Sequence, residues 1–272
     1  MKENNLHFIE KMYSRLDKML LDSQGDCYYL NLGYWKDTNN ANLACEALID
    51  LVLSKAELKD GFKILDAGFG YGHQDVYIAK KNPNLHIFGV NIMPRQVEIA
   101  KQKVQKEFLS NRVFLFEGSA TKLPFENDTF DAVIAIESAF HFDTRESFFE
   151  ESWRVLKKDG VLCLTDCLPL SNFTKNEQFF LASQKMGIPI ENQYPIDEYV
   201  SKLSINGFEK ISYQNLSEFV LPHSAAEMKQ KNGWRSKKEV YLPQNIDLNQ
   251  YLKGFTEATT IGSYYLIKAH KK

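Results

Sequence analysis

Apolar residues along the chain fall into short blocks that are separated by glycine, proline and polar residues. Nearly continuous apolar runs predict buried strands at residues 63–67, 85–90, 113–117, 130–136 and 160–165. Between these runs, apolar side chains recur at helical spacing over residues 76–81, 94–108 and 148–156. Strands that alternate with helices predict βαβ units with right-handed crossovers. We therefore expect an α/β fold with a doubly wound, mostly parallel sheet.

The regions on either side of this alternating block have different patterns. Residues 4–22 and 41–53 carry apolar side chains at helical spacing and predict helices before the sheet. After Pro169 the regular alternation ends. There the patterns predict helices at 171–194 and 196–205, further strands at 208–219 and 263–270, and irregular structure over 223–256. Because we find no linker and no internal repeat, we expect a single elaborated domain.

Charge and cysteine content exclude several classes of protein. The 33 Lys and Arg residues against 35 Asp and Glu give a net charge of −2, so the chain lacks the strong field of a dedicated nucleic-acid binder. The four cysteines, Cys27, Cys45, Cys163 and Cys167, contain no Cys-x-x-Cys pair and form no disulfide framework. The N-terminus has no signal-peptide pattern, and no apolar run is long enough to span a membrane. We expect a cytoplasmic protein that binds neither nucleic acid nor membrane.

A glycine-rich motif follows the first predicted strand. Asp66 precedes Gly68, Gly70 and Gly72 at alternating positions, where the chain must turn sharply and a ligand can approach the backbone. Dinucleotide-binding loops place a further glycine one position later, where this chain has His73. The carboxylate of Asp66 would repel a pyrophosphate but attract an ammonium group. The motif therefore favours a ligand with an amino group over a dinucleotide.

This motif resembles motif I of the class I S-adenosylmethionine (AdoMet) methyltransferases. The resemblance implies that Asp66 and the three glycines hold the amino-acid end of AdoMet. After the second strand, Asn91 stands where the family usually has an acidic residue for the ribose hydroxyls, and Gln96 follows five positions later, as in related subfamilies. After the third strand, Ser119 and Ala120 occupy the segment that borders the adenine, with Ser119 in place of the usual Asp.

A further resemblance narrows the family. Residues 29–36, together with the segments 66–75, 117–125 and 137–141, are similar to macrolide-sugar 3″-O-methyltransferases of the erythromycin type. This resemblance implies a Rossmann-like sheet of seven strands with an antiparallel last strand. It also implies a lid role for Tyr34 and Trp35 and a cofactor contact for Glu137. The implied parts of the domain are a helical cap (1–60), an AdoMet-binding core (61–170), a lid region (171–205) and C-terminal strands with an acceptor-side insertion (206–272).

Two side chains at the same edge of the predicted sheet are candidates for catalysis. His141 follows the fourth strand, and Asp166 ends the fifth. Methyl transfer to a hydroxyl needs alignment of the acceptor and removal of one proton, and a histidine oriented by a carboxylate is a suitable base. We therefore predict that His141 deprotonates a small-molecule acceptor and that Asp166 orients it. We expect no metal site, because Asp166 alone does not supply the several acidic ligands that one needs.

Two other functions fit the same cofactor-binding half. One is methylation of carbon or nitrogen in a lipid, an isoprenoid or an amine, which needs no base when the acceptor is already nucleophilic. The other is a non-catalytic AdoMet-binding regulator or assembly protein, in which motif I would be retained without turnover. His141 separates these alternatives, because only the O-methyltransferase requires it as a base.

Overall fold

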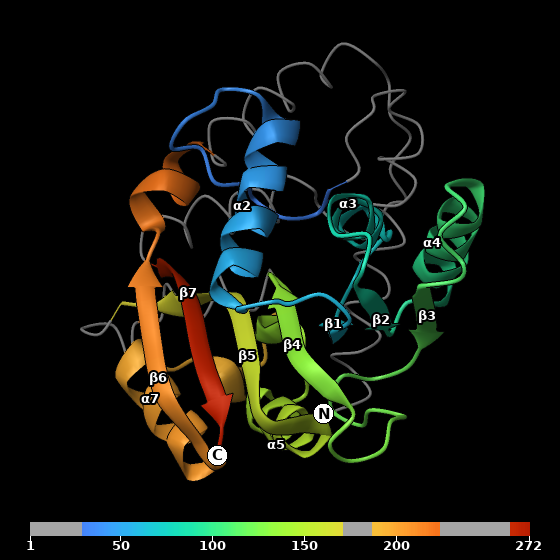
Figure 1. Ribbon diagram of the computed structural model, residues 1–272. Coiled ribbons are helices and arrows are strands. Elements are labelled where there is room, and N and C mark those ends of the chain that lie inside the picture. Colours follow the sequence, from blue (N-terminus) through green and yellow to red (C-terminus); the bar gives the residue numbers. More distant parts are fainter. Residues whose placement is uncertain (1–28, 171–186, 224–261) are drawn as a thin grey trace, which may run out of the picture.

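Seven strands form one sheet in the computed structural model, which describes residues 29–170, 187–223 and 262–272 (Figure 1). Their order across the sheet is β3-β2-β1-β4-β5-β7-β6. The bounds are β1 Lys63–Ala67, β2 His86–Asn91, β3 Val113–Glu117, β4 Phe130–Ile136, β5 Leu156–Pro169, β6 Phe208–Asn215 and β7 Gly262–Lys271. β1 to β5 pair in parallel, whereas β7 lies antiparallel between β5 and β6. The predicted doubly wound sheet with an antiparallel last strand is confirmed.

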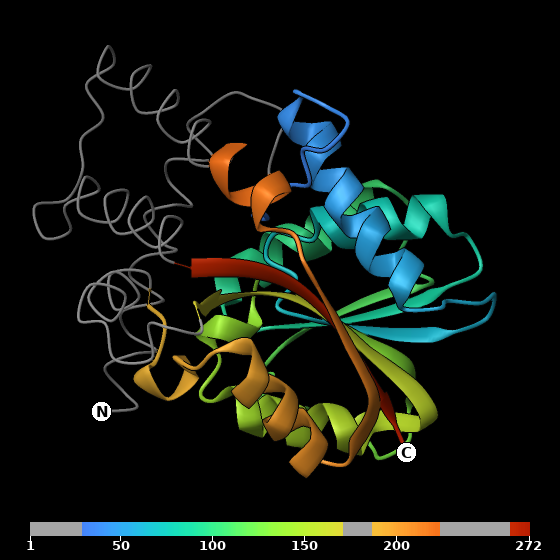
Figure 2. The ribbon, with the colours of Figure 1, turned by 90° about the vertical axis from the view of Figure 1, so that its left-hand side faces the viewer.

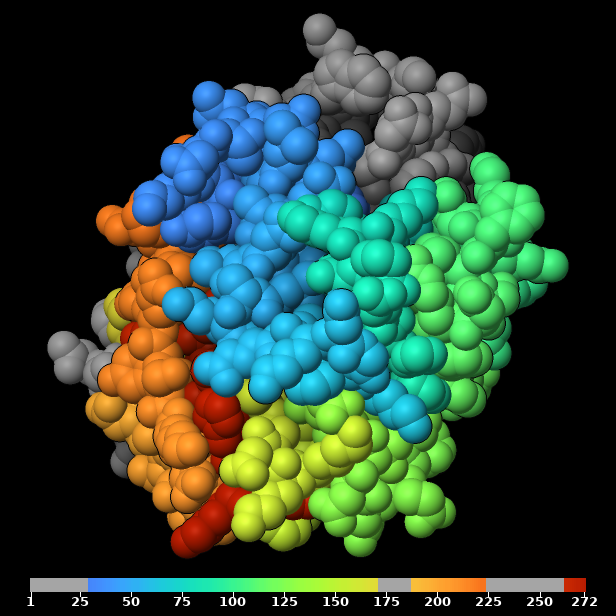
Figure 3. All heavy atoms as spheres, in the orientation of Figure 1, coloured from blue at the N-terminus to red at the C-terminus, as the bar shows by residue number. Residues whose placement is uncertain are grey.

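Helices cover both faces of this sheet. Their bounds are α2 Ala41–Lys55, α3 His73–Lys81, α4 Pro94–Lys106, η1 Ala139–His141, α5 Arg145–Val155, η3 Ile190–Asn192 and α7 Ile196–Ile205. Residues 217–223 are also helical. Figure 2 shows α2, α3 and α4 on one face and α5 and α7 on the other. In the space-filling view, α2 and α3 cross the front of the molecule (Figure 3).

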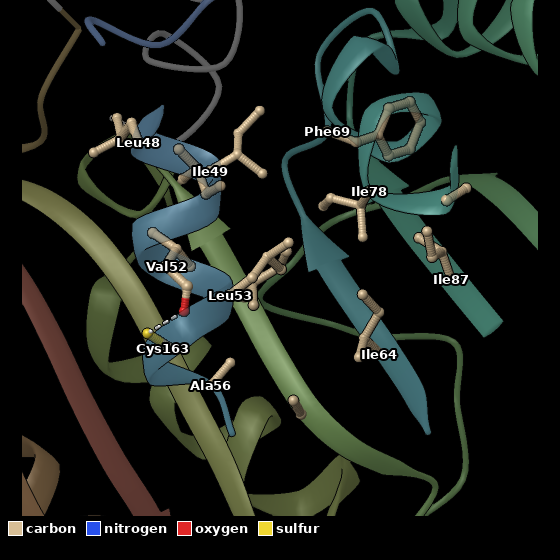
Figure 4. Packing of buried hydrophobic residues seen from close by; sticks show 14 of the residues in the cluster. Leu48, Ile49, Val52, Leu53, Ala56, Ile64, Phe69, Ile78, Ile87 and Cys163 are labelled. Carbon is tan, nitrogen blue, oxygen red and sulfur yellow. Dashed lines mark hydrogen bonds between the residues drawn. The ribbon is translucent and has the colours of Figure 1, made fainter. Parts of the chain in front are cut away.

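Each face buries its own apolar layer. Ile64 and Leu65 are neighbours on β1 but belong to opposite layers, because successive side chains of a strand point to opposite faces. Ile64 packs in the layer under α2 and α3 (Figure 4). In that layer the Sγ of Cys163 donates to the carbonyl of Val52, 3.5 Å away, so Cys163 serves as a core residue. The site is built on the ends of the strands, and the two apolar layers hold these strand ends in place.

Two predictions for the C-terminal half need correction. Strand β6 ends at Asn215, not at residue 219, because the Asn215 Oδ1 accepts bonds from the backbone N and the Oγ of Ser217 and residues 217–223 are helical. Residues 187–194 do not continue a helix but form a loop with the single turn η3. Gly187 has a φ of +70°, and Pro189 follows it, so a regular helix cannot pass through this segment.

Several predictions fall on residues outside the described ranges. These are the helix at 4–22, the first part of the predicted helix at 171–194, nearly all of the irregular region at 223–256, and Cys27. None of the helices described in the structure combines the length and the apolar character needed to cross a membrane.

Candidate active site

The loop between β1 and α3 takes its shape from the glycines of the predicted motif. Gly68 and Gly72 have φ angles of +90° and +71°, which L side chains disfavour. A Cβ at Gly68 would collide with Ser138 after β4, and one at Gly72 would collide with α4. A Cβ at Gly70 would meet the side chain of Leu30, which crosses the loop. The protein's own packing therefore requires glycine at Gly68 and Gly72.

Asp66 and Asp75 are two buried carboxyl groups beside this loop. The Gln74 side-chain amide donates to Oδ2 of Asp66, but Oδ1 of Asp66 and both oxygens of Asp75 are buried without a hydrogen-bond partner in the described structure. Burial raises the pKa of Asp66 to about 7. Burial, and then the charge of Asp66, raise the pKa of Asp75 well above its usual value. A bound cation would stabilise the ionised form of this pair.

Asn91 and Gln96 lie against each other at the end of β2. The Asn91 Nδ2 donates to the Gln96 Oε1 at 2.8 Å, and it lies 3.5 Å from the carbonyl of Gly70. The Nε2 of Gln96 is buried and has no partner in the described structure. Asn91 and Gln96 therefore lie beside the glycine loop, and the Nε2 of Gln96 is available to donate to a ligand.

Ser119 and Ala120 follow β3 at the same edge of the sheet. The Oγ of Ser119 lies 2.8 Å from the Oγ1 of Thr121 and also accepts from the backbone N of Thr121. Ala120 is buried against the layer under α5. The hydroxyl of Ser119 thus stabilises its own turn.

Residues 29–36 pack on the helical residues 217–223. The Tyr34 ring meets Phe219 edge-on at 5.4 Å, and the Trp35 ring stacks on His223 at 5.7 Å. The backbone N of Trp35 also donates to the carbonyl of Phe219 at 3.0 Å. Two segments far apart in sequence therefore meet above the strand ends through these rings.

Glu137, at the end of β4, ties residues 29–36 to the sheet. Its Oε1 accepts from the backbone N of Leu32 at 2.8 Å and from the hydroxyl of Tyr264 at 2.7 Å. Burial raises the pKa of Glu137 to about 7, although both bonds act in the opposite direction. Glu137 has a φ of +53°, which directs this residue out of the strand. These contacts place Glu137 between the N-terminal segment and β7.

His141 ends the 3-10 turn η1, in the connection that follows β4. Ser138, in the same connection, donates its hydroxyl to the carbonyl of Ala67 at 2.6 Å. The Nδ1 of His141 lies 3.2 Å from the carbonyl of Gly187, which can only accept, so Nδ1 carries the proton. Burial and, more weakly, the charge of Arg145 lower the pKa of His141 to about 4, although the bond to Gly187 acts in the opposite direction. The imidazole is therefore neutral at physiological pH.

Asp166 has a different partner from the one predicted. Arg145 donates from Nε and Nη2 to the two oxygens of Asp166, each at 2.8 Å, and Tyr199 donates to Oδ2 at 3.2 Å. Neither side chain of the Arg145–Asp166 pair is exposed to solvent. A carboxylate bound in this way neutralises the guanidinium. The expected His141–Asp166 pair is therefore replaced by a buried ion pair with Arg145.

Arg145 and Asn192 belong to this site, and the sequence analysis missed both. Arg145 opens α5 three residues before the predicted helix start, with Thr144 as the N-cap. A cation at a helix N-terminus is unfavourable to the helix dipole, so its presence could have indicated a specific acidic partner. Asn192 follows a loop whose position depends on tertiary packing, and we find no local signal for it in the sequence.

Comparisons with known proteins agree with this geometry. A family profile described as a methyltransferase domain matches residues 65–164. The erythromycin 3″-O-methyltransferase of Saccharopolyspora erythraea is 35% identical over 201 residues, which are 71% of this chain and 66% of that protein. The aligned region thus spans just under two thirds of that relative's length. The chain belongs to the class I AdoMet-dependent methyltransferases.

Two further comparisons extend over more of this methyltransferase. The 27-O-demethylrifamycin SV methyltransferase of Amycolatopsis mediterranei is 28% identical over 250 residues, covering 89% of each chain. A geranyl diphosphate C-methyltransferase from Streptomyces coelicolor A3(2), solved with S-adenosyl-L-homocysteine, has a TM-score of 0.67. At 17% identity, over 85% of this chain and 82% of that one, it shows the fold alone. Because the chain belongs to the AdoMet-dependent methyltransferases, AdoMet is the methyl donor of this methyltransferase.

Groups around the glycine loop of this methyltransferase fit AdoMet chemically. The unpartnered carboxyl oxygens of Asp66 and Asp75 suit the α-ammonium group. The unused Nε2 donor of Gln96 suits a ribose hydroxyl. Among the residues that the structure describes, no group of three or more metal-ligating side chains is found.

Proposed function

We propose that this methyltransferase transfers the AdoMet methyl group to a hydroxyl of a small molecule of the sugar or polyketide-like class. The observation that carries the proposal is the bond from the Nδ1 of His141 to the carbonyl of Gly187, in the connection whose Ser138 contacts the glycine loop. The names of the two relatives refer to erythromycin and to a demethylrifamycin, and this supports the acceptor class.

Bound AdoMet supplies a sulfonium-linked methyl group that a nucleophilic oxygen can attack. The chain's own contribution begins with holding the cofactor. In the proposal, the Asp66 carboxylate binds the α-ammonium group, Asn91 and Gln96 bind the ribose hydroxyls, and the remaining contacts come from the loops after β1, β3 and β4 and from the N-terminal segment. Those remaining residues are Gly68, Gly70, Gly72, Ser119, Ala120, Glu137 and Tyr34.

His141 takes the proton of the acceptor hydroxyl. Because Nδ1 donates to Gly187, the lone pair lies on Nε2, which is the atom that accepts the proton. The low pKa of about 4 keeps the imidazole in its neutral, proton-accepting form throughout the physiological range. Alignment of the acceptor with the methyl donor supplies much of the remaining rate. Asp166 has no direct part in this step, since Arg145 and Tyr199 occupy its oxygens.

Methylation of carbon or nitrogen is the alternative that remains. The structural neighbour from Streptomyces coelicolor is named as a C-methyltransferase, and its fold is shared. A π-bond or an amine lone pair attacks without prior deprotonation, so this alternative does not need His141.

The test compares His141→Ala with the unchanged enzyme on a panel of hydroxylated acceptors, with release of S-adenosylhomocysteine and product mass as readouts. General-base catalysis contributes about 10²- to 10⁴-fold, and we expect a loss of that size. AdoMet affinity, measured by calorimetry, should stay within about threefold. His86→Ala, at an exposed position on β2, is the matched control and should retain activity.

Each alternative gives a different result in this assay. Unchanged turnover in His141→Ala would remove the base and favour a carbon or nitrogen acceptor. AdoMet binding without S-adenosylhomocysteine release on any acceptor would favour a non-catalytic role.

The arrangement of the chain follows from the same proposal. We assign residues 1–60 as the cap, 61–170 as the AdoMet-binding core, 171–205 as the lid region, and 206–272 as C-terminal strands with an acceptor-side insertion. We also place the reaction in the cytoplasm, with no nucleic-acid or membrane partner.

A further inference from the structure

The side-chain amide of Asn192 bonds to the backbone on both sides of His141. Its Nδ2 donates to the carbonyl of Phe140 at 3.1 Å and to the carbonyl of Phe142 at 2.8 Å. Its Oδ1 accepts from the backbone N of Arg145 at 2.9 Å. Asn192 is almost fully buried, with 1% of its surface exposed, so both donor hydrogens and the acceptor oxygen are committed to this one place.

The backbone around His141 depends on such outside bonds. Turn η1 has only three residues, and a single 3-10 turn has poor hydrogen-bond geometry of its own. Its internal bonds are those from the N of His141 to Ser138 and from the N of Phe142 to Ala139. The carbonyls of Phe140 and Phe142 point outward and receive the Asn192 amide. A change at Asn192 would therefore release the backbone before and after the imidazole.

The imidazole ring and its backbone are held by the same loop. Gly187, which accepts from the Nδ1 of His141, lies five positions before Asn192, and turn η3 links the two. A displacement of this loop would move the ring contact and the two backbone contacts together. The geometry points to Asn192 as the positioning residue that sets the orientation and tautomer of His141. This inference rests on the proposed role of His141 as the base.

A buried cluster fixes Asn192 in turn. Arg145 donates from Nη1 to the backbone carbonyl of Asn192, while its Nε and Nη2 hold Asp166 at the end of β5. The rings of Tyr194 and Tyr199 lie 5.2 and 5.4 Å from the Arg145 guanidinium carbon. The predicted link between Asp166 and His141 thus exists in an indirect form, through Arg145 and Asn192.

The experiment uses Asn192→Asp, which keeps the oxygen that accepts from the backbone N of Arg145. It replaces the Nδ2 amide group by a second, charged carboxylate oxygen, so both donors to the Phe140 and Phe142 carbonyls are lost. Asn206→Asp is the matched control, because the Nδ2 of Asn206 also donates to a backbone carbonyl, that of Lys202, at the end of α7. We expect kcat of Asn192→Asp to fall about 10- to 100-fold, in line with the cost of misplacing a reacting group by about 1 Å. The KM and Kd for AdoMet should stay within about threefold, and Asn206→Asp should keep its kcat.

A spectroscopic readout separates positioning from a general structural role. In ¹⁵N NMR of the free enzyme, His141 should be the Nδ1–H tautomer. In Asn192→Asp it should become a mixture of the two tautomers. In a His141→Ala background, Asn192→Asp should reduce the remaining turnover by no more than about twofold, because the group that it positions is gone.

The outcomes separate this inference from the proposed function. A changed tautomer in Asn192→Asp, together with full activity of His141→Ala, would support the positioning and overturn the base. An unchanged His141 spectrum and kcat would overturn the positioning, whatever the acceptor is. If Asn192→Asp does not fold, the variant Asn192→Ala is used instead, and the tautomer of His141 is also measured in the unchanged enzyme. A wild-type His141 with its proton on Nε2 would then overturn the inference.

Discussion

Arg145 donates two hydrogen bonds of 2.8 Å, one to each carboxylate oxygen of Asp166, and neither side chain is exposed to solvent. The pair joins the first residue of α5 to a residue near the carboxyl end of β5. A buried charge is costly unless it is paired, so each member of this pair depends on the other. The pair thereby fixes the loop that carries Asn192.

Removal of Arg145 should destabilise the fold strongly. In Arg145→Met, Asp166 would remain buried without its main counter-charge, and we expect a loss of about 3 to 5 kcal/mol in the free energy of unfolding. The measurement is urea denaturation. The control is Lys81→Met, which breaks the exposed Lys81–Asp50 pair at 2.6 Å and should cost less than about 1 kcal/mol. Equal losses of unfolding free energy in Arg145→Met and Lys81→Met would show that the buried ion pair stabilises the fold no more than the exposed one.

AdoMet affinity should depend on pH through Asp66. Burial raises the pKa of Asp66 to about 7, so below pH 7 the free enzyme must release a proton before the carboxylate can bind an ammonium group. We expect the Kd to rise by up to about tenfold for each pH unit below 7. In Asp66→Asn, the affinity should be weak and nearly independent of pH. Calorimetric titrations at pH 6 and 7.5 test both statements, and a flat profile in the unchanged enzyme would contradict them.

Asp75 should make the free enzyme less stable as the pH rises. Its pKa is raised in the folded state, first by burial and then by the charge of Asp66, so the folded chain holds a proton that the unfolded chain has lost. This contribution to stability is complete below the ordinary carboxyl pKa of about 4 and is lost as the pH rises toward the raised value.

The variant Asp75→Asn removes that dependence. Its stability relative to the unchanged enzyme should increase by about 1 to 3 kcal/mol between pH 5 and pH 8. Urea denaturation without AdoMet gives the comparison. Asp60→Asn, at an exposed position, is the control and should show no such trend. A constant difference between the two pH values would mean that Asp75 is ionised in the folded enzyme.

Gln96 should matter for the cofactor more than for the fold. Its Nε2 is buried without a partner in the described structure, while its Oε1 accepts from Asn91. In Gln96→Met we expect an AdoMet affinity about 5- to 30-fold lower and a stability loss of only about 1 kcal/mol. Calorimetry and urea denaturation measure the two effects. Gln102→Met, on the exposed side of the same helix, should leave the affinity unchanged.

The sequence by itself determined the sheet and the cofactor loop, because both depend on local patterns. Apolar runs of the right length specify buried strands, and the motif from Asp66 to Gly72 specifies a tight turn between a strand and a helix. The resemblance assigned Asn91 and Gln96 to the cofactor site, and the structure joins these two side chains by a hydrogen bond.

Only the tertiary structure decided the partners of the buried polar groups. His141 follows β4 and Asp166 lies near the carboxyl end of β5, and their shared edge predicted a pair. Arg145 instead occupies that carboxylate, and Asn192 bonds to the backbone around His141. These contacts join residues 21 to 52 positions apart, across loops with no periodic pattern. Which side chain fills a buried hydrogen-bonding position depends on loop paths and on competition for donors and acceptors, and such non-local choices leave no trace in spacing.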